Sequence, residues 1–155
     1  MFRLHRWFFE PFILRIAKKI FFSSKEYAAA HGFTFETTVP NETRISILPF
    51  GVDTKRFHVG RDDAFRDAHN IPRDATVIIF VGGLDAAHYF KGVDVLLAAC
   101  AKITDPSWHL LVVGSGERKA AFEALAVQLG ITERVHFVGS VPFEELPRAY
   151  GAADI

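Results

Sequence analysis

The chain has 155 residues, of which 50% are hydrophobic and 23% are charged, and this length has room for about one domain. The composition excludes intrinsic disorder, which requires low hydrophobicity or a strong net charge. Lysine plus arginine and aspartate plus glutamate each number 18, so the chain as a whole shows no electrostatic preference for nucleic acid. The single cysteine, Cys100, excludes an internal disulfide, and its apolar helical surroundings predict a core residue.

The first part of the chain is predicted to be helix and loop. The pattern favours a helix over 2–21 and a second helix over 25–30 that Ser24 would cap, followed by a polar loop over 33–44. Charges interrupt the apolar run of the first helix, so we expect neither a signal peptide nor a transmembrane helix. Residues 1–25 carry six cations against one acid, a local balance of +5.

From residue 45 onward, strand and helix patterns alternate. The predicted strands cover 45–48, 76–81, 108–113 and 134–138, and another begins at 153–155. The predicted helices cover 62–69, 91–103, 117–129 and 143–150. This alternation with short loops predicts parallel strands joined by right-handed crossovers, the doubly wound α/β arrangement.

Glycine follows each of the three main strands, at Gly82-Gly83, at 114–116 and at Gly139. Ligands of such sheets bind beyond the carboxyl ends of the strands, where glycine lets the backbone approach a diphosphate. The alternative is that glycine is simply the usual way to turn out of a strand. The dinucleotide pattern G-x-G-x-x-G is absent, and the charge of Glu117 would repel a pyrophosphate, which weakens an NAD-type interpretation.

Two side chains near the first of these turns are candidate ligand contacts. Lys91 is predicted to open a helix, where the helix dipole disfavours a cation unless the ammonium faces a bound anion; a solvated lysine is the alternative. His88, with Asp85 in the same loop, is a candidate donor to a phosphate or a sugar hydroxyl. The histidines lack metal-ligand spacing and no nucleophilic triad is present, so we expect no metal site and no cofactor.

Five motifs in order over 45–155 are similar to those of the retaining glycosyltransferases of family 4, also called glycosyl transferases group 1. They read ILPFGVD with a following Phe57, FVGGL with KGVDVLL, LVVGSG, LGI with RVHFVG, and EEL with YGAADI. Residues 16–27 resemble the end of the first domain of that family, with Lys18 at a position that is usually Asp.

The resemblance implies a GT-B enzyme with two Rossmann-like domains, of which the second holds a UDP-, GDP- or ADP-sugar without a metal. Residues 1–44 would then be a remnant of the acceptor domain and the interdomain linker, and 45–155 a partial nucleotide-sugar-binding domain. The residues implied at the donor diphosphate are Lys91, Gly82, Gly83 and His88. Those implied at the nucleotide pocket, mainly through backbone, are Gly114, Ser115, Gly116, Phe137, Val138 and Val141.

The chain departs from the family pattern in two respects. Gly83 stands where the family has an arginine that binds phosphate, and we hypothesise that the insertion 85–90 compensates through His88. The E-x7-E region and most of the acceptor domain are expected to lie outside this chain. The catalytic set would then be incomplete, and the chain alone is expected to be marginally folded and without transferase activity.

The implied function is sugar transfer to a glycan or lipid-linked acceptor in polysaccharide or glycolipid synthesis. The implied location is the cytoplasm, with the inner face of the membrane as a further candidate. A nucleotide-sugar epimerase on the same scaffold is one alternative. Another is a stand-alone nucleotide-binding or membrane-surface module that places 1–25 on anionic lipid.

Overall fold

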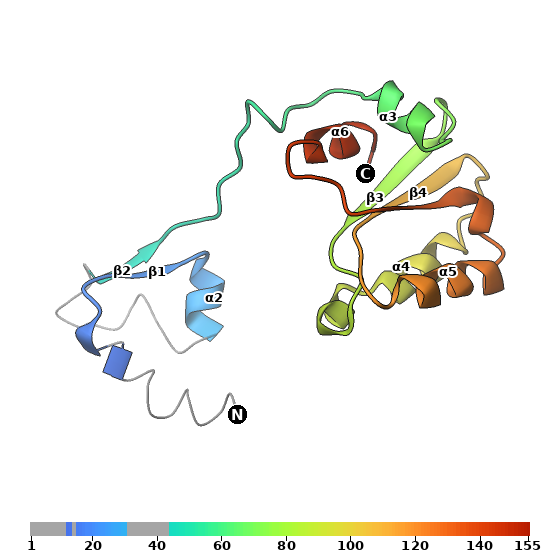
Figure 1. Cartoon of the computed structure of the whole chain (residues 1–155). Helices are drawn as coiled ribbons and strands as arrows, with labels where there is room; N and C mark the ends of the chain where they lie inside the picture. The colour runs from blue at the N-terminus through green and yellow to red at the C-terminus, as the bar shows by residue number, and fades with distance from the viewer. Residues whose placement is uncertain (1–11, 14, 31–43) are drawn as a thin grey trace. The chain divides into compact units, whose positions relative to one another are not determined.

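The computed structural model describes residues 12–13, 15–30 and 44–155, and the chain divides into two compact units, Met1–Val52 and Asp53–Ile155 (Figure 1). The division falls after Val52 rather than after Arg44, because the strand predicted from residue 45 pairs within the first unit. No helix in these ranges is long and apolar enough to cross a membrane.

The first unit contains a short parallel strand pair and one helix. Strand β1 (Ile20–Phe22) pairs with β2 (Ile45–Ile47), and the Ser24 hydroxyl accepts the Tyr27 N–H at 3.0 Å, which caps helix α2 (Lys25–Ala30). The predicted cap is therefore confirmed. The predicted helix 2–21 is wrong at 17–21. Residues 17–19 are not helical, and isoleucine and phenylalanine at 20–21 favour the strand that β2 completes. Its residues 2–11 and 14, and 33–43 of the predicted loop, lie outside the described residues.

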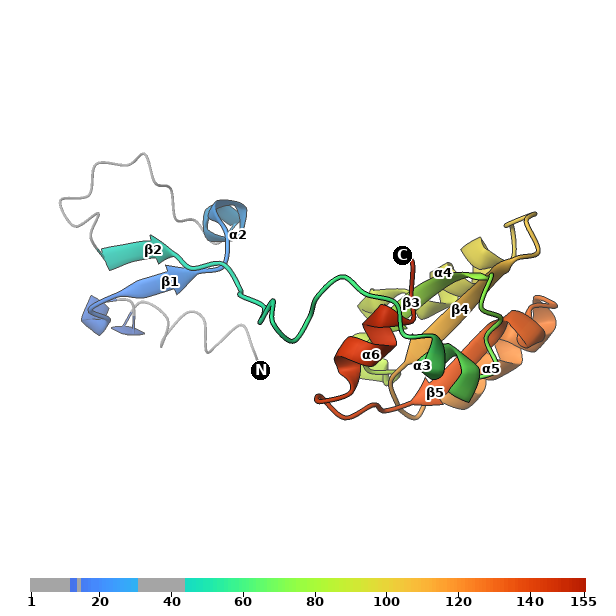
Figure 2. The same ribbon diagram turned by 90° about the horizontal axis from the view of Figure 1, so that it is seen from above.

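The second unit is built on a parallel sheet of strand order β3-β4-β5 (Figure 2). The strands are β3 (Thr76–Val81), β4 (Trp108–Val113) and β5 (Val135–Gly139). In register, Phe80 pairs with Val112, and Val112 pairs with Phe137. The predicted parallel arrangement is confirmed.

Helices cover both faces of this sheet, α4 and α5 on one side and α3 and α6 on the other (Figure 1). Their bounds are α3 (Asp63–Ala68), α4 (Val93–Cys100), α5 (Lys119–Gln128) and α6 (Leu146–Gly151). Two 3₁₀ segments, η2 (Ala86–Lys91) and η3 (Thr132–Arg134), precede α4 and β5. The four helices match the predicted ones with shifts at their ends.

Strand β4 supplies both cores through the alternation of its side chains. Leu110 and Val112 are buried against the α4 and α5 side, where Cys100 also lies as predicted, and Leu111 and Val113 are buried against the α3 and α6 side. Burying one such side chain stabilises the fold by about 1.5–3 kcal/mol. The continuous apolar run of β4 therefore reflects burial on both faces.

The chain end lies along the free edge of β3. The N–H of Asp154 donates to the carbonyl of Val77 at 2.8 Å, and the N–H of Ile79 donates to the carbonyl of Ile155 at 2.9 Å. These bonds continue the sheet beyond β3, as predicted for a strand beginning at 153–155.

A buried arginine, which the sequence analysis did not identify, joins α3 to this edge. The side chain of Arg66 is fully buried and donates to the carbonyls of Ala152 and Ala75 at 2.8 and 2.9 Å. It also donates to the Asp154 carboxylate at 2.8 Å, whose same oxygen accepts the N–H of Val77 at 2.7 Å. One guanidinium thus connects the helix, the sheet and the end of the chain.

Replacing Arg66 with methionine should lower the free energy of unfolding by about 3–5 kcal/mol, because it leaves the buried carbonyls of Ala75 and Ala152 without this donor and removes the ion pair with Asp154. Urea unfolding of the 155-residue chain measures this loss. The matched control is Arg73→Met, because Arg73 forms an exposed ion pair with Asp67 at 2.6 Å. That control should cost at most about 1 kcal/mol. Equal losses in the two variants would contradict the role given to Arg66.

Two histidines of neighbouring strands contact each other within the sheet. The Nδ1 of His109 on β4 lies 2.8 Å from the Nε2 of His136 on β5, and the rings stack with centroids 5.1 Å apart. Burial lowers the pKa of both imidazoles, and nearby charge adds to this, from Arg134 at His109 and from His109 at His136. The pair is therefore neutral in the folded protein near neutral pH.

The free energy of unfolding should fall as the pH drops from about 7.5 to about 5, since the unfolded histidines bind protons at about 6.5 while the folded pair resists them. Urea titrations across this range measure the slope. The double variant His109→Gln/His136→Gln should reduce the slope, and His69, whose pKa burial also lowers, should contribute the remainder. His58→Gln, at an exposed position, should leave the slope unchanged. An unaltered slope in the double variant would show that other groups cause the dependence.

Candidate functional site

The loops that follow the three strands are joined by backbone hydrogen bonds. The N–H of Gly82 donates to the carbonyl of Val113 at 2.9 Å, and the N–H of Gly114 donates to that of Gly139 at 2.8 Å. The N–H of Leu84 donates to the carbonyl of Ser115, also at 2.9 Å. The carboxyl ends of β3, β4 and β5 therefore form one connected rim.

Two glycines of the β4 loop allow this close packing. A Cβ on Gly114, whose φ is +148°, would overlap the carbonyl oxygen of Gly82. A Cβ on Gly116 would overlap the backbone of Leu84. The absence of these side chains is thus required by the contact between neighbouring loops, whatever else the rim binds.

Lys91 lies at the end of β3. Its Nζ is 2.7 Å from the position that a Cβ on Gly82 would take. Lys91 ends the 3₁₀ segment η2, and Gly92, with φ +65°, separates it from α4, which begins at Val93. The prediction that Lys91 opens a helix is therefore wrong, because a left-handed glycine interrupts the helical backbone. Within the described residues Lys91 has no ion pair, so its charge at the rim is not neutralised.

His88 and Asp85 form a pair beside the next glycine. The Nδ1 of His88 lies 2.8 Å from each carboxylate oxygen of Asp85, which also accepts the His88 N–H at 3.1 Å. The hydrogen bond from the His88 side chain lowers the pKa of Asp85. A Cβ on Gly83 would lie 2.8 Å from the His88 Nδ1, so a glycine at this position makes room for the pair.

Glu117 holds the loop that carries these residues. Its Oε1 accepts the N–H of Ala86 at 2.8 Å, which links the start of η2 to the β4 loop. From the sequence alone, this carboxylate is only a charge that would repel phosphate. In the structure it also anchors the segment that bears His88 and Lys91.

The residues predicted for the nucleotide pocket do not form one side-chain cluster. Phe137 packs against the core under α4 and α5, whereas Val138 and Val141 pack against the core under α3 and α6. Ser115 lies at the rim, where its hydroxyl is 2.7 Å from that of Ser140. Contacts of Phe137, Val138 and Val141 with a nucleotide would therefore come from their backbone.

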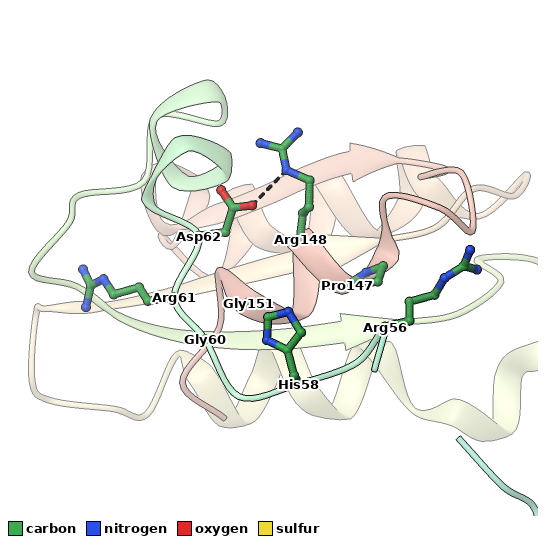
Figure 3. A pocket seen from close by; sticks show the side chains of 8 residues that line it. All are labelled: Arg56, His58, Gly60, Arg61, Asp62, Pro147, Arg148 and Gly151. Atoms are coloured by element: carbon green, nitrogen blue, oxygen red, sulfur yellow. Dashed lines mark hydrogen bonds and ion pairs between the residues drawn. The ribbon is translucent and has the colours of Figure 1, made fainter. Parts of the chain in front are cut away.

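A separate cleft of about 210 Å³ lies between the segment before α3 and helix α6 (Figure 3). Its lining residues are Arg56, His58, Gly60, Arg61, Asp62, Pro147, Arg148 and Gly151. The three guanidinium groups point in different directions, and two of them pair with carboxylates, Arg148 with Asp62 and Arg61 with Asp63. None of the predicted site residues lines this cleft.

Across the described part of the chain, no group of three or more His, Cys, Asp or Glu side chains is arranged to hold a metal ion. Two basic side chains, Lys91 and His88, lie at the rim beside the backbone of the glycine loops. That combination suits an anion.

The family described as Glycosyl transferases group 1 matches residues 61–155, which include the sheet, its helices and the rim. This chain belongs to the glycosyl transferases group 1 family. It is 40% identical over 118 residues to D-inositol 3-phosphate glycosyltransferase of Mycobacterium sp. (strain JLS), a match that covers 73% of this chain and 26% of the relative. The chain therefore spans about a quarter of the length of this curated relative.

Solved structures of other proteins share the fold. The Anabaena Alr3699/HepE crystal structure with UDP and glucose superimposes with a TM-score of 0.72 at 18% identity, covering 93% of this chain and 38% of that one. Sucrose-phosphate synthase from Thermosynechococcus elongatus gives 0.68 at 28% identity, covering 94% and 35%. The sequence motifs predict a GT-B fold, and this prediction is confirmed.

Gly114→Ala should destabilise this group 1 chain by about 3 kcal/mol or more, because the added methyl group overlaps a backbone carbonyl that cannot move without breaking the rim. Urea unfolding provides the measurement. Gly130→Ala is the control: Gly130 also has a positive φ, +68°, but has open space around it. It should lose only about 1–2 kcal/mol. A Gly114 variant as stable as the control would refute the close-packing account of the rim.

Proposed function

We propose that this chain is the donor-binding part of a retaining glycosyltransferase and that its rim holds the diphosphate of a nucleotide sugar. The observation that carries the proposal is the position of the Lys91 ammonium over Gly82 at the end of β3, without a carboxylate partner in the described residues. An unneutralised cation beside close-approach glycines is a suitable site for a diphosphate.

The same cation would serve the reaction as well as binding. When the sugar leaves the nucleotide, negative charge develops on the terminal phosphate, and a fixed ammonium stabilises that charge. Gly82 would let the phosphate approach the strand end. Backbone groups of Gly114, Ser115 and Gly116 would line the adjoining nucleotide pocket, together with backbone at 137–141.

The relatives support a sugar nucleotide as the ligand. The curated relative is named for a sugar-transfer reaction, and the Anabaena protein of similar fold was crystallised with UDP and glucose. Transfer to a glycan or lipid-linked acceptor, without a metal, belongs to the same proposal for the whole protein. For the 155-residue chain we propose binding of the donor without sugar transfer.

Lys91→Met should weaken binding of the preferred nucleoside diphosphate about tenfold or more, because a charged hydrogen bond to phosphate is lost. Calorimetric titration of the chain with UDP, GDP and ADP measures the affinity and identifies the preferred base. Lys102→Met removes an equal charge from an exposed position just after α4, and it should leave the affinity unchanged. Identical affinities for the wild type and the Lys91 variant would overturn the proposal.

A further inference from the structure

Two basic side chains lie over two successive glycines at the end of β3. Lys91 places its Nζ 2.7 Å from the Cβ position of Gly82, and His88 places its Nδ1 2.8 Å from the Cβ position of Gly83. The resemblance expects an arginine at position 83, and the space where that side chain would begin is taken by the imidazole and by the Asp85 carboxylate, whose Oδ2 is also 2.8 Å from that Cβ position. His88 and the lysine that the proposed function uses thus lie over neighbouring residues at the same strand end.

Asp85 determines which nitrogen of His88 carries a proton. Both carboxylate oxygens face Nδ1 at 2.8 Å, and a carboxylate accepts hydrogen bonds but does not donate them. Nδ1 is therefore the protonated nitrogen, and Nε2 is the nitrogen that Asp85 does not engage. In the neutral ring Nε2 presents a lone pair, which repels a phosphate oxygen, whereas in the imidazolium it presents an N–H donor.

A bound diphosphate would place further negative charge near the ring, in addition to that of Asp85. Asp85 contributes a negative charge in direct contact, and Glu117 from the β4 loop holds the same turn through the N–H of Ala86. Lys91 lies over the neighbouring glycine, and a bound diphosphate would neutralise its charge. The His88 side chain is 42% exposed, so a ligand has access to it.

We infer that His88, oriented by Asp85, is a second contact to the donor diphosphate that binds only as the imidazolium. Asp85 is the positioning residue, and binding takes up a proton. This inference rests on the proposed function, since it concerns the same ligand at the same rim. It makes donor affinity depend on pH in a way that an arginine at position 83 would not.

Calorimetric titrations with inorganic pyrophosphate and with UDP, GDP and ADP test the inference between about pH 8 and about pH 6, the range in which histidine changes charge. Because the phosphates also titrate in this range, the comparison is between wild type and His88→Gln at each pH. Relative to the variant, the wild type should bind about tenfold more tightly at the lower pH and about equally at the higher one.

Proton uptake separates a direct contact from a structural role. In buffers of different ionisation enthalpy, the wild type should take up more protons on binding at about pH 7.5 than His88→Gln does. Asp85→Asn retains the hydrogen-bonding shape but removes the charge, and it should lose most of this difference. Urea unfolding checks that both variants fold as the wild type does.

A rescue variant tests the spatial argument. His88→Ala should lose the affinity gained at low pH, and the double variant Gly83→Arg/His88→Ala should restore tight binding without pH dependence. Without the ring, the Asp85 carboxylate, whose Oδ2 is also 2.8 Å from the Cβ position of Gly83, can rotate away from the arginine. If the double variant binds these ligands no more tightly than His88→Ala does, the idea that His88 takes the place of an arginine at position 83 is overturned.

The outcomes also distinguish this inference from the proposed function. If neither pyrophosphate nor any nucleoside diphosphate binds the wild type at any pH, the proposed function fails. If these ligands bind with an affinity that depends on Lys91, but His88→Gln shows the same affinities and proton uptake as the wild type, the inference alone fails. If Asp85→Asn shows the same affinities and proton uptake as the wild type, Asp85 has no part in the inferred contact.

Discussion

The burial of both faces of strand β4 is the constraint on which the rest of the second unit depends. Leu110 and Val112 face one helical layer, and Leu111 and Val113 face the other, so the strand is covered only if helices pack on each side. Parallel neighbours joined through those helices bring the carboxyl ends of all three strands to one edge. The position of the candidate site follows from this hydrophobic pattern.

At that edge, packing and ligand binding use the same residues. Gly114 is a glycine because the Gly82 carbonyl lies where its side chain would be, and this contact draws the β3 and β4 loops together. Gly82 and Gly83 in turn leave room for Lys91 and for the Asp85–His88 pair. The structural and the functional explanations of these glycines, which appear as alternatives in the sequence, are therefore compatible.

The charged side chains of the second unit differ in whether they form ion pairs. Arg66 is buried and neutralised by Asp154, and Arg148 pairs with Asp62 beside the cleft near α6. Lys91 is the contrasting case, since its ammonium at the rim has no ion pair within the described residues. A chain with no formal net charge can thus carry an unpaired ammonium at the rim, while Arg66 and Arg148 form ion pairs that join segments distant in sequence.

The sequence by itself determined the doubly wound class, the approximate helices and strands of the second unit, and the glycines of the rim, because these depend on local periodicity and backbone freedom. Only the tertiary structure decided that Ile20–Phe22 is a strand, that Arg66 is buried and that His109 contacts His136. Each of these depends on a partner distant in sequence. The positions of Lys91 and of the Asp85–His88 pair depend on the 3₁₀ turn and on the left-handed Gly92. Local propensity does not specify the geometry of either feature.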